Sequence, residues 1–351
     1  MKYKNILITG GAGFIGSNLS LKLIDKGYRV TVLDNLSPQI HGENSPLYNS
    51  IKDKVKFIKG TVLSYDDWKI ALDGVDVVVH LAAETGTGQS MYEIEKYTDV
   101  NIKGSSIFLD ILANEKHSVK KMIIASSRAI YGEGKYECPN CGVVYPDERK
   151  DKDMEKGDFA VKCPNCGIDA KPQATDEISK IHPSSIYGIT KQVQEQMFMV
   201  MGKSLNIPVV VFRYQNVYGA GQSLRNPYTG ILSIFSTRIK NGNDINIFED
   251  GLESRDFVYV DDVVEATILG IEKDEANYEA FNVGSGVAIN VLTVANTLIN
   301  AYNSRSRITI TKNYRLGDIR HNYADLSKIK SNLGFEPKVS FKEGIERFTK
   351  W

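Results

Sequence analysis

Short apolar runs alternate with stretches of helical spacing along the first third of the chain. The runs that have the character of buried strands cover residues 5–9, 30–33, 55–58, 75–81 and 122–125. Between them, residues 16–26 and 94–114 carry apolar side chains at helical spacing. This alternation predicts a doubly wound parallel sheet with helices on both faces, the α/β arrangement of a Rossmann fold.

A polar segment at 133–181, rich in Lys, Asp and Pro, interrupts this pattern. The pattern resumes with a helix over 184–204 and a strand over 209–212, and the last third is mixed, with a helix beginning near Val291. We therefore expect three parts. They are a Rossmann domain over 1–215 that also takes in about 255–286, an inserted segment over 133–181, and a smaller mixed α/β substrate domain over 216–351 interleaved with the first.

A glycine-rich turn follows the first strand and opens the first helix, reading Thr9-Gly-Gly-Ala-Gly-Phe-Ile-Gly16. Gly10 permits a tight turn, Gly13 lets a pyrophosphate approach the backbone, and Gly16 allows close packing of helix and strand. The helix N-terminus favours the phosphate charge. The motif in this context predicts a dinucleotide site.

Asp34 ends the second strand, where a carboxylate would accept hydrogen bonds from both ribose hydroxyls. The same charge would repel a 2′-phosphate. The sequence therefore favours NAD over NADP.

Tyr187 and Lys191 form a Tyr-x-x-x-Lys pair in a segment of helical character. Residues four apart share one face of a helix, so the ammonium is expected near the phenol. A nearby cation would lower the pKa of the tyrosine from about 10 and suit it to act as a base near neutrality.

Charge and hydropathy exclude several classes of partner. Lys plus Arg and Asp plus Glu number 43 each among 351 residues, so there is no overall field for nucleic acid or anionic membrane. No apolar run approaches the ~18 residues of a membrane span. The N-terminal residues do not have the pattern of a signal peptide, and we expect a cytoplasmic protein.

Two identical pentapeptides hold all four cysteines: Cys138-Pro-Asn-Cys141-Gly and Cys163-Pro-Asn-Cys166-Gly. In a cytosolic chain this spacing indicates a metal site of four thiolates, for which Zn²⁺ is the usual occupant, with iron or free thiols as alternatives. Four protein ligands leave no open position, so we expect a structural zinc-ribbon-like insertion that borders the substrate pocket as a lid or wall. An interaction module is the competing interpretation. Acids match bases between the pairs, which argues against nucleic acid, whereas a protein contact stays open.

The ordered motifs resemble the extended short-chain dehydrogenase/reductase family, which includes the NAD-dependent epimerases and dehydratases of nucleotide sugars. They are TGGAGFIG from Thr9, Asp34-Asn35, His80-Leu-Ala-Ala83, Asn101, Ser126-Ser127, Tyr131-Gly132, Pro183-Ser-Ser-Ile-Tyr187-Gly-Ile-Thr-Lys191, Arg213-Tyr-Gln-Asn216-Val-Tyr-Gly219, Arg255-Asp-Phe-Val-Tyr-Val-Asp261 and Arg315-Leu-Gly-Asp318. The resemblance covers nearly the whole chain. It also implies a homodimer through a helix bundle that includes the helix of Tyr187.

The resemblance assigns roles to individual residues. The catalytic group is Ser127, Tyr187 and Lys191. The cofactor residues are Gly10, Gly13, Phe14, Ile15, Gly16, Asp34, Asn35, Thr61, Val62, Leu81, Ala82, Ala83 and Asn101, together with Tyr187 and Lys191. The residues that bind the nucleotide-diphosphate sugar are Thr85, Ser127, Arg128, Asn216, Arg255, Arg315 and Asp318. One departure is Thr61, which stands where many relatives have an aspartate near the adenine.

The residues after Ser127 bear on the reaction. Dehydratases of the family read Thr-Asp-Glu before Val-Tyr-Gly, and their two acids eliminate water, whereas this chain has Ser127-Arg128-Ala129. We therefore exclude dehydration and expect 4-epimerisation, in which a 4-keto sugar takes the hydride back on its other face. A 4-keto-sugar reductase and a non-catalytic sensor of NAD or a sugar nucleotide are the alternatives.

Four finer segments resemble the branch that interconverts dTDP-L-rhamnose and dTDP-6-deoxy-L-talose, rather than the UDP-hexose 4-epimerases. They run from Asp34 to Gly42, from Ala83 to Met91, from Tyr214 to Gly219 and from Asn226 to Gly230. Relatives in that branch also carry a cysteine-bearing insertion. The expected substrate is therefore a dTDP-linked 6-deoxyhexose.

Overall fold

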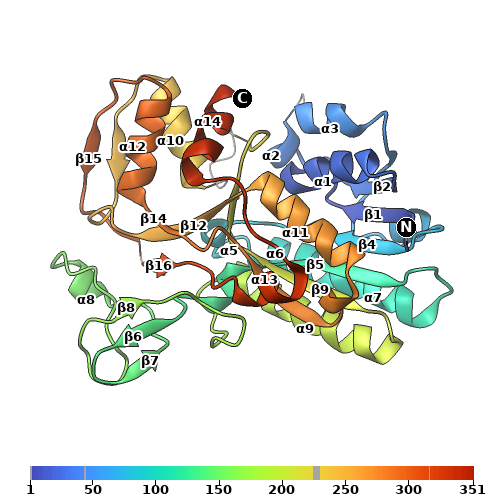
Figure 1. Ribbon diagram of the computed structural model, residues 1–351, viewed down its shortest axis with the longest axis horizontal. Helices are drawn as coiled ribbons and strands as arrows, with labels where there is room; N and C mark the ends of the chain where they lie inside the picture. Colours follow the sequence, from blue (N-terminus) through green and yellow to red (C-terminus); the bar gives the residue numbers. More distant parts are fainter. Residues whose placement is uncertain (1, 43–44, 224–229, 316) are drawn as a thin grey trace.

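A single parallel sheet of seven strands organises the larger part of the computed structural model, which describes residues 2–42, 45–223, 230–315 and 317–351 (Figure 1). The strand order is β13-β9-β5-β4-β1-β2-β3, and every neighbouring pair is parallel. The strands are β1 (Asn5–Thr9), β2 (Arg29–Asp34), β3 (Lys56–Lys59), β4 (Val77–His80), β5 (Lys121–Ser127), β9 (Val209–Tyr214) and β13 (Glu279–Val283). This confirms the expected Rossmann-like α/β fold.

Helices cover both faces of this sheet because successive strand residues point to opposite sides. Ile6 and Ile8 lie in one core with Leu19, whereas Leu7 lies in a second core with Trp68 and Phe108. The first face is covered by α1 (Phe14–Asp25), α3 (Pro46–Ile51) and α11 (Val260–Glu272), and the second by α4 (Tyr65–Ala71), α7 (Gly104–Asn114) and α9 (Ile186–Leu205).

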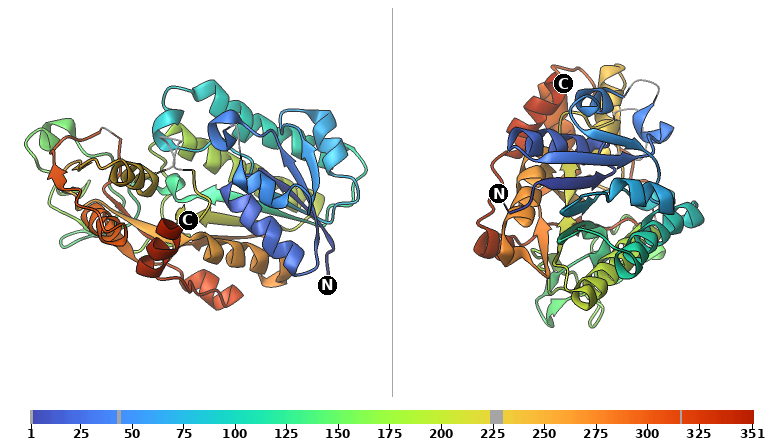
Figure 2. Two further views of the ribbon diagram at one scale, coloured as in Figure 1. Left: turned by 90° about the horizontal axis from the view of Figure 1, so that it is seen from above. Right: turned by 90° about the vertical axis from the view of Figure 1, so that its right-hand side faces the viewer.

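A second, smaller lobe lies beside the carboxyl ends of the strands (Figure 2). In it β12 (Ser254–Tyr259) pairs with β10 (Asn216–Tyr218), β14 (Ala288–Asn290) and β16 (His321–Asn322), and β11 (Ile245–Ile247) pairs with β15 (Ile308–Ile310). Its helices are α10 (Ile231–Lys240), α12 (Val291–Ala301) and α14 (Phe341–Lys350), while α13 (Ser327–Leu333) packs near β13.

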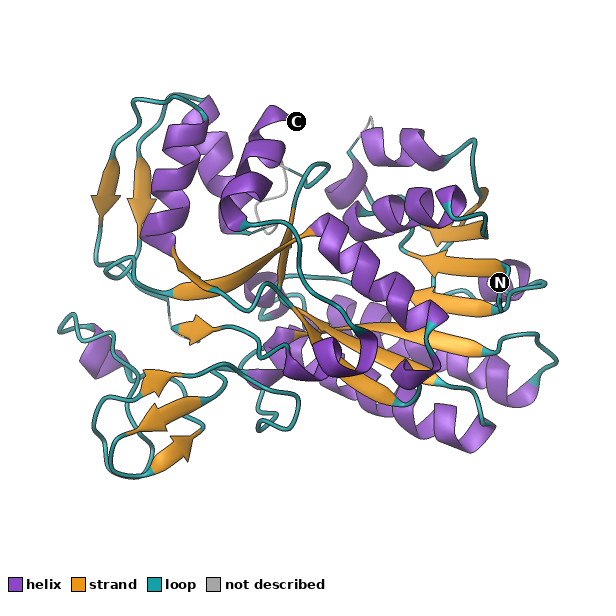
Figure 3. Cartoon of the chain, viewed as in Figure 1, coloured by secondary structure: helices purple, strands orange, loops and turns teal. Residues whose placement is uncertain are grey.

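The cysteine-bearing segment forms a separate small unit that projects below β16 (Figures 1 and 3). It contains β6 (Tyr136–Cys138), β7 (Gly142–Val144), β8 (Lys171–Pro172) and the single turn α8 (Asp151–Met154). Its core is small, made of Tyr136, Cys138, Val144, Val161 and Cys163. The two ends of the unit meet where the Lys135 amide donates to Thr175 Oγ1 at 3.1 Å.

The helix expected over 94–114 is continuous but contains one wide turn. It runs from α6 (Ile94–Thr98) through a π-helical turn at Asp99–Lys103 into α7. Short helices that the periodicity does not predict include α2 (Pro38–His41), α5 (Thr87–Ser90) and the 3₁₀ turns Arg128–Tyr131 and Asp274–Ala276. Within the described ranges, no helix combines the length and the apolar character needed to cross a membrane.

Candidate active site

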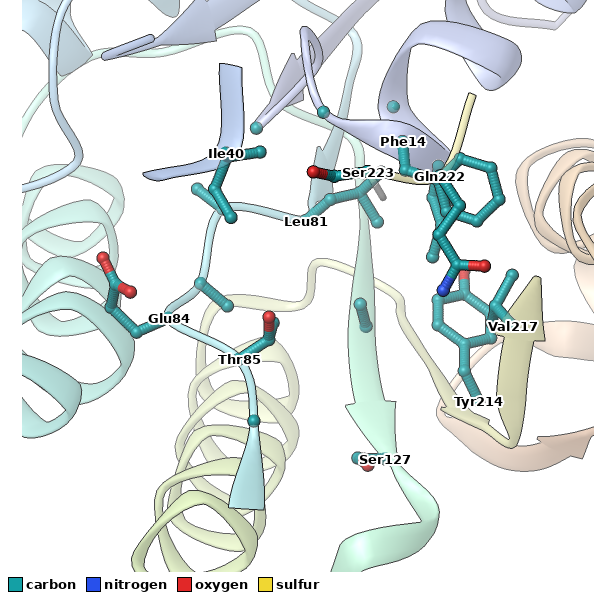
Figure 4. A pocket seen from close by; sticks show the side chains of 18 of the residues that line it. Phe14, Ile40, Leu81, Glu84, Thr85, Ser127, Tyr214, Val217, Gln222 and Ser223 are labelled. Atoms are coloured by element: carbon teal, nitrogen blue, oxygen red, sulfur yellow. The ribbon is translucent and has the colours of Figure 1, made fainter. Parts of the chain in front are cut away.

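A cavity of about 530 Å³ lies over the carboxyl ends of β1, β2, β4 and β5, between the sheet and the smaller lobe (Figure 4). This edge is where open α/β sheets bind ligands. The cavity is lined by most of the predicted cofactor residues, namely Gly10, Gly13, Phe14, Ile15, Gly16, Asp34, Asn35, Thr61, Val62, Leu81, Ala82 and Ala83. It also reaches Thr85, Ser127, Arg128, Tyr187, Lys191 and Asn216, so one space joins the two groups of residues.

The glycine turn has no room for larger residues. Gly10 has a φ of +67°, and a Cβ there would lie 2.8 Å from the Ala82 amide nitrogen. A Cβ at Gly16 would lie 2.4 Å from the Gly10 carbonyl oxygen, because α1 starts directly against this turn. The backbone and the helix N-terminus are thus open to a pyrophosphate, as the motif requires.

Asp34 stands at the end of β2 with its carboxylate buried. It accepts hydrogen bonds from the Ala12 amide at 3.0 Å and the Leu36 amide at 2.9 Å, which fixes its orientation in the cavity wall. His41, which the sequence did not single out, places Nε2 3.3 Å from the Asp34 carboxylate. The sequence offered no signal for His41, because the short helix α2 that carries it has no apolar periodicity.

Two predicted cofactor residues hold the cavity wall in different ways. Thr61 lines the cavity, and its amide donates to Asp67 Oδ2 at 2.8 Å. Although Thr61 replaces the aspartate of many relatives, the Asp67 carboxylate reaches the same turn from α4. Asn101 is fully buried and does not line the cavity. Its side chain bonds the amide and the carbonyl of Glu84, at 2.9 and 3.1 Å, and so supports the loop after β4.

Ser127 and Tyr187 face one another from two elements that the sheet fixes. Ser127 is the last residue of β5, and its hydroxyl hydrogen-bonds the Tyr187 phenol. The neighbouring Ser126 hydroxyl is instead occupied by Glu195, at 2.9 Å. Tyr187 lies in the first turn of α9, where the Ser185 hydroxyl caps the helix by accepting from the Gly188 amide.

The charges around Tyr187 differ from the expectation. Lys191 lies on the same face of α9, but its ammonium donates to Gln194 Oε1 at 2.7 Å, and burial lowers the pKa of Lys191 to about 7. Burial raises the pKa of Tyr187, against the lowering effects of the Ser127 hydrogen bond and the Arg128 charge. The prediction that Lys191 lowers the tyrosine pKa is therefore wrong for this structure, in which Arg128 supplies the acting cation.

Replacing Lys191 by methionine should stabilise the cofactor-free protein. The folded-state pKa of about 7 lies below the ordinary value of 10.5, so the cost of burying the ammonium is present in full below pH 7. That cost shrinks as the pH rises from 7 towards 10.5. We expect Lys191→Met to raise the free energy of unfolding by on the order of 2 kcal/mol at pH 6 and by much less at pH 10.

Urea titrations at the two pH values measure this difference. Lys203→Met is the matched control, because Lys203 lies on the same helix with an exposed side chain. An equal effect of Lys191→Met at both pH values would contradict the assigned burial cost.

The predicted substrate residues divide between two cavities. Arg128 and Asn216 line the large cavity, where Arg128 Nε donates to Asn216 Oδ1 at 2.7 Å. A second cavity of about 100 Å³ adjoins it and is lined by Arg128, Arg255 and Asp318 among others. Burial and the neighbouring Arg255 charge lower the pKa of Arg128 to about 9.

Arg315 lies apart from both cavities. Its side chain is exposed, and the guanidinium carbon sits 5.0 Å from the centre of the Phe248 ring, so this structure does not bring it to the other substrate residues. Residues 226–229 of the segment that ends at Gly230 lie outside the described residues.

Three further residues position the catalytic group and escaped the sequence analysis. The Ser90 hydroxyl accepts from the Tyr187 amide at 3.0 Å, and Tyr97 donates to the Thr85 carbonyl at 2.6 Å with its ring edge-on to Tyr187. Gln194 donates to the Asn101 carbonyl at 3.3 Å. They lie on separate elements, so no spacing in the sequence relates them.

The four cysteines converge, as the paired pentapeptides predict. Their sulfur atoms all lie within 4.8 Å of one another, and Cys138 Sγ is 3.5 Å from Cys166 Sγ. Cys138 and Cys163 are buried and the other two are exposed. The insertion is, however, not the expected wall of the substrate pocket, because none of its described residues lines either cavity.

This fold and this cavity define a class of protein. It is a nucleotide-binding α/β enzyme with a serine, tyrosine and lysine group. The chain matches the model of the NAD dependent epimerase/dehydratase family over residues 6–151 and 164–284, and it belongs to that family.

Two sequence relatives and two solved structures illustrate the similarity. The dTDP-L-rhamnose 4-epimerase of Burkholderia thailandensis is 35% identical over 99% of this chain and 94% of its own. A putative UDP-glucose 4-epimerase of Methanocaldococcus jannaschii is 31% identical over 99% and 97%. The UDP-glucose 4-epimerase of Thermotoga maritima with UDP-glucose superposes with a TM-score of 0.81, at 32% identity over 99% and 97%. The UDP-glucuronic acid 4-epimerase of Bacillus cereus, in complex with UDP-glucuronic acid and NAD, gives 0.79 at 26% identity over 99% and 98%.

Proposed function

We propose that this chain is a nucleotide-sugar 4-epimerase that uses NAD. The observation that carries the proposal is a single cavity that joins the glycine turn to Ser127, Tyr187 and Lys191 with no acid beside Ser127. The only acidic residues among the described lining of this cavity are Asp34 and Glu84. Asp34 lies at the dinucleotide end, and Figure 4 shows the Glu84 carboxylate turned away from Ser127.

The residues present fit NAD. The turn at Gly10, Gly13 and Gly16 leaves the backbone open to a pyrophosphate, and the fixed carboxylate of Asp34 suits two ribose hydroxyls while repelling a 2′-phosphate. Thr61, Val62, Leu81, Ala82 and Ala83 would cover the remaining faces of the dinucleotide. When bound, NAD supplies a reversible acceptor for the C4 hydride.

The chain itself handles the proton. Tyr187 would take the proton of the sugar 4-hydroxyl in its phenolate form, which the Arg128 charge stabilises against the effect of burial, while Ser127 is hydrogen-bonded to the 4-oxygen. When the hydride returns to the other face of the 4-keto sugar, the same proton goes back to the 4-oxygen. The cycle therefore consumes no oxidant and needs no second acid.

The pair Arg128 and Ala129 argues against the other branches of the family. Elimination of water needs an acid and a base next to the catalytic hydroxyl. Here a guanidinium bonded to Asn216 and a methyl group stand in those places. Epimerisation, which needs neither, is left as the simplest chemistry.

For the substrate we propose dTDP-L-rhamnose and dTDP-6-deoxy-L-talose. Support comes from the 35% identity to the Burkholderia relative along nearly both chains. The 32% identity to the Thermotoga enzyme favours UDP-hexoses as the second candidate. Asn216 and Arg128, with Arg255 and Asp318 in the adjoining cavity, would hold the diphosphate and ribose.

Three further assignments belong to this proposal. The converging cysteines fit one structural Zn²⁺, bound by four thiolates. Such thiolates need the reducing conditions of the cytoplasm, where we place the protein.

A homodimer through α9 would cover exposed apolar side chains at Met91, Ile94, Ile189 and Val200. Sedimentation of the purified protein as a monomer would contradict the dimer.

Turnover without added cofactor tests the function. Purified protein is incubated with dTDP-L-rhamnose, UDP-glucose and UDP-galactose in separate reactions, and the sugar is followed by proton NMR. Formation of dTDP-6-deoxy-L-talose is the expected result. Conversion of UDP-hexoses alone would replace the substrate and keep the reaction. No conversion, together with oxidation of NADH when a 4-keto sugar is supplied, would replace the epimerase by a reductase.

A further inference from the structure

Arg149 belongs to the cysteine-bearing insertion, where its guanidinium contacts the Phe159 carbonyl at 3.4 Å and lies 3.8 Å from Glu133, but its shortest hydrogen bonds reach outside the insertion. Its guanidinium makes a bidentate pair with Glu249, at 2.7 and 2.8 Å, and donates from Nη2 to the Asp318 carbonyl at 2.8 Å. Only 4% of the Arg149 side chain is exposed. A buried planar fork of this kind fixes two partners at once, which a surface ion pair does not.

The segment that Arg149 reaches, 318–320, is also held from its other side. Arg320 donates from Nη1 to the same Glu249 at 2.7 Å and from Nη2 to Asp250 at 2.7 Å. Its backbone amide donates to both oxygens of Glu133, at 2.8 and 2.9 Å. The segment is therefore clamped between the start of the insertion, at Glu133, and its middle, at Arg149.

The clamped segment in turn holds Arg255. The Arg255 guanidinium donates from Nη2 to the Ile319 carbonyl at 2.7 Å and from Nη1 to the Arg320 carbonyl at 3.0 Å. Gly317, Asp318 and Ile319 line the small cavity with Arg255 and Arg128. Two partly buried guanidinium groups outnumber the single carboxylate, that of Asp318, in this cavity of about 100 Å³ and form a site for an anion such as a diphosphate.

The rest of the insertion supports Arg149 at this place. The Tyr314 hydroxyl donates to Asp151 at 2.6 Å, and the Phe159 ring packs against the Tyr314 ring with centroids 6.5 Å apart. Figure 1 shows β6, β7, β8 and α8 gathered below β16. The insertion thus contacts the binding cavity through one intermediate layer of chain.

We propose that Arg149 is a positioning residue through which the insertion sets the affinity for the nucleoside diphosphate part of the substrate. Arg149 bonds the backbone carbonyl of Asp318 and the carboxylate of Glu249. These bonds hold in place the backbone carbonyls that orient Arg255. This inference rests on the proposed function only in taking the substrate to be a nucleoside diphosphate sugar. It adds that the insertion serves binding and leaves the reacting groups at Ser127, Tyr187 and Lys191 untouched.

The test measures binding separately from turnover. Calorimetric titration of the full-length protein with dTDP and with UDP gives a Kd, and the proton NMR assay gives kcat and KM. For Arg149→Met we expect Kd and KM to rise about tenfold, with kcat and bound NAD close to wild type. Lys162→Met is the matched control, since Lys162 pairs with Asp158 and Asp169 inside the insertion and should leave Kd unchanged.

Two additional variants keep the test decisive. Arg149→Lys retains the charge but loses the planar fork that bonds both oxygens of Glu249 and the Asp318 carbonyl, so it should raise Kd in the same direction even if Arg149→Met does not fold. Arg149→Met combined with Arg255→Lys should raise Kd by less than the product of the two single effects, because both act at one site. An unchanged Kd in a folded Arg149 variant, or fully multiplicative effects, would overturn the proposal. Wild-type protein that binds dTDP or UDP but converts no sugar would overturn the proposed function and leave this inference standing.

Discussion

Tyr187→Phe should lower epimerase turnover about a thousandfold and leave the amount of bound NAD unchanged. The variant removes one hydroxyl, the group that takes the sugar proton, and positioned acid–base groups contribute about 10²–10⁴ in rate. The ring remains to fill its place against Tyr97, and its backbone bond to Ser90 does not involve the hydroxyl. Proton NMR of the sugar measures turnover, and absorbance of the denatured protein's supernatant measures the released dinucleotide.

Tyr28→Phe is the control for the loss of a phenol. The Tyr28 hydroxyl donates to Glu272 at 2.9 Å and lines neither described cavity, so this variant should turn over at the wild-type rate. Turnover of Tyr187→Phe within tenfold of wild type would show that another group accepts the proton. Loss of NAD from Tyr187→Phe would show that the residue binds the cofactor more than it acts on the sugar.

Cys163→Ser should abolish the proposed zinc binding and open the insertion without unfolding the sheet. The apolar cluster of the insertion holds Tyr136, Val144 and Val161 besides two of the cysteines, and Met154 and Phe159 are buried apart from it, which is too little to fold a polar segment by itself. A metal that closes such a unit contributes folding free energy directly. Without the metal, we expect the free energy needed to open the insertion to fall by on the order of 5 kcal/mol. Metal analysis should give one zinc ion per chain for the wild type and none for the variant.

Limited proteolysis between β7 and β8 measures this opening, because an opened unit should be cleaved there faster than the closed one. Lys162→Met should remain as resistant as wild type. If the positioning role of Arg149 holds, Cys163→Ser should also weaken dTDP binding about as much as Arg149→Met does. Iron in place of zinc would change the assigned metal, and a zinc-free variant that resists proteolysis like wild type would end the structural role.

The alternation of apolar runs and helical stretches was enough to predict the sheet and its two helical layers, since each strand buried on both faces is a continuous apolar run. It did not identify β13 as the seventh strand, because Glu279–Val283 alternates weakly and its pairing with β9 is a long-range contact. The π-helical turn at Asp99–Lys103 also escaped prediction. Its irregular bonding is fixed by Gln194 and Thr190 on another helix, which bond Asn101.

The parts of the candidate site that rest on a local motif were predictable from the sequence. The parts in which burial sets the direction of a side chain were less predictable. The glycine turn, Asp34 and the convergence of the cysteines followed from spacing alone. The direction in which Lys191 points did not, because Gln194 lies one turn further along the same helix and competes for its ammonium. The sequence also placed Arg315 in the substrate site, whereas its guanidinium lies over the Phe248 ring. That position depends on the packing of the smaller lobe.

The meeting of the two ends of the insertion at Lys135 and Thr175 bears on how this chain arose. A unit whose entry and exit points are joined can be gained or lost in one genetic event, since removing it leaves a short gap that a turn can close. The family match continues into both ends of this unit and is interrupted only between residues 151 and 164. Any descendant that lost it would also lose Arg149, and with it one of the two guanidinium groups that pair with Glu249, the other being that of Arg320. Lineages with and without the unit should therefore differ at both places together.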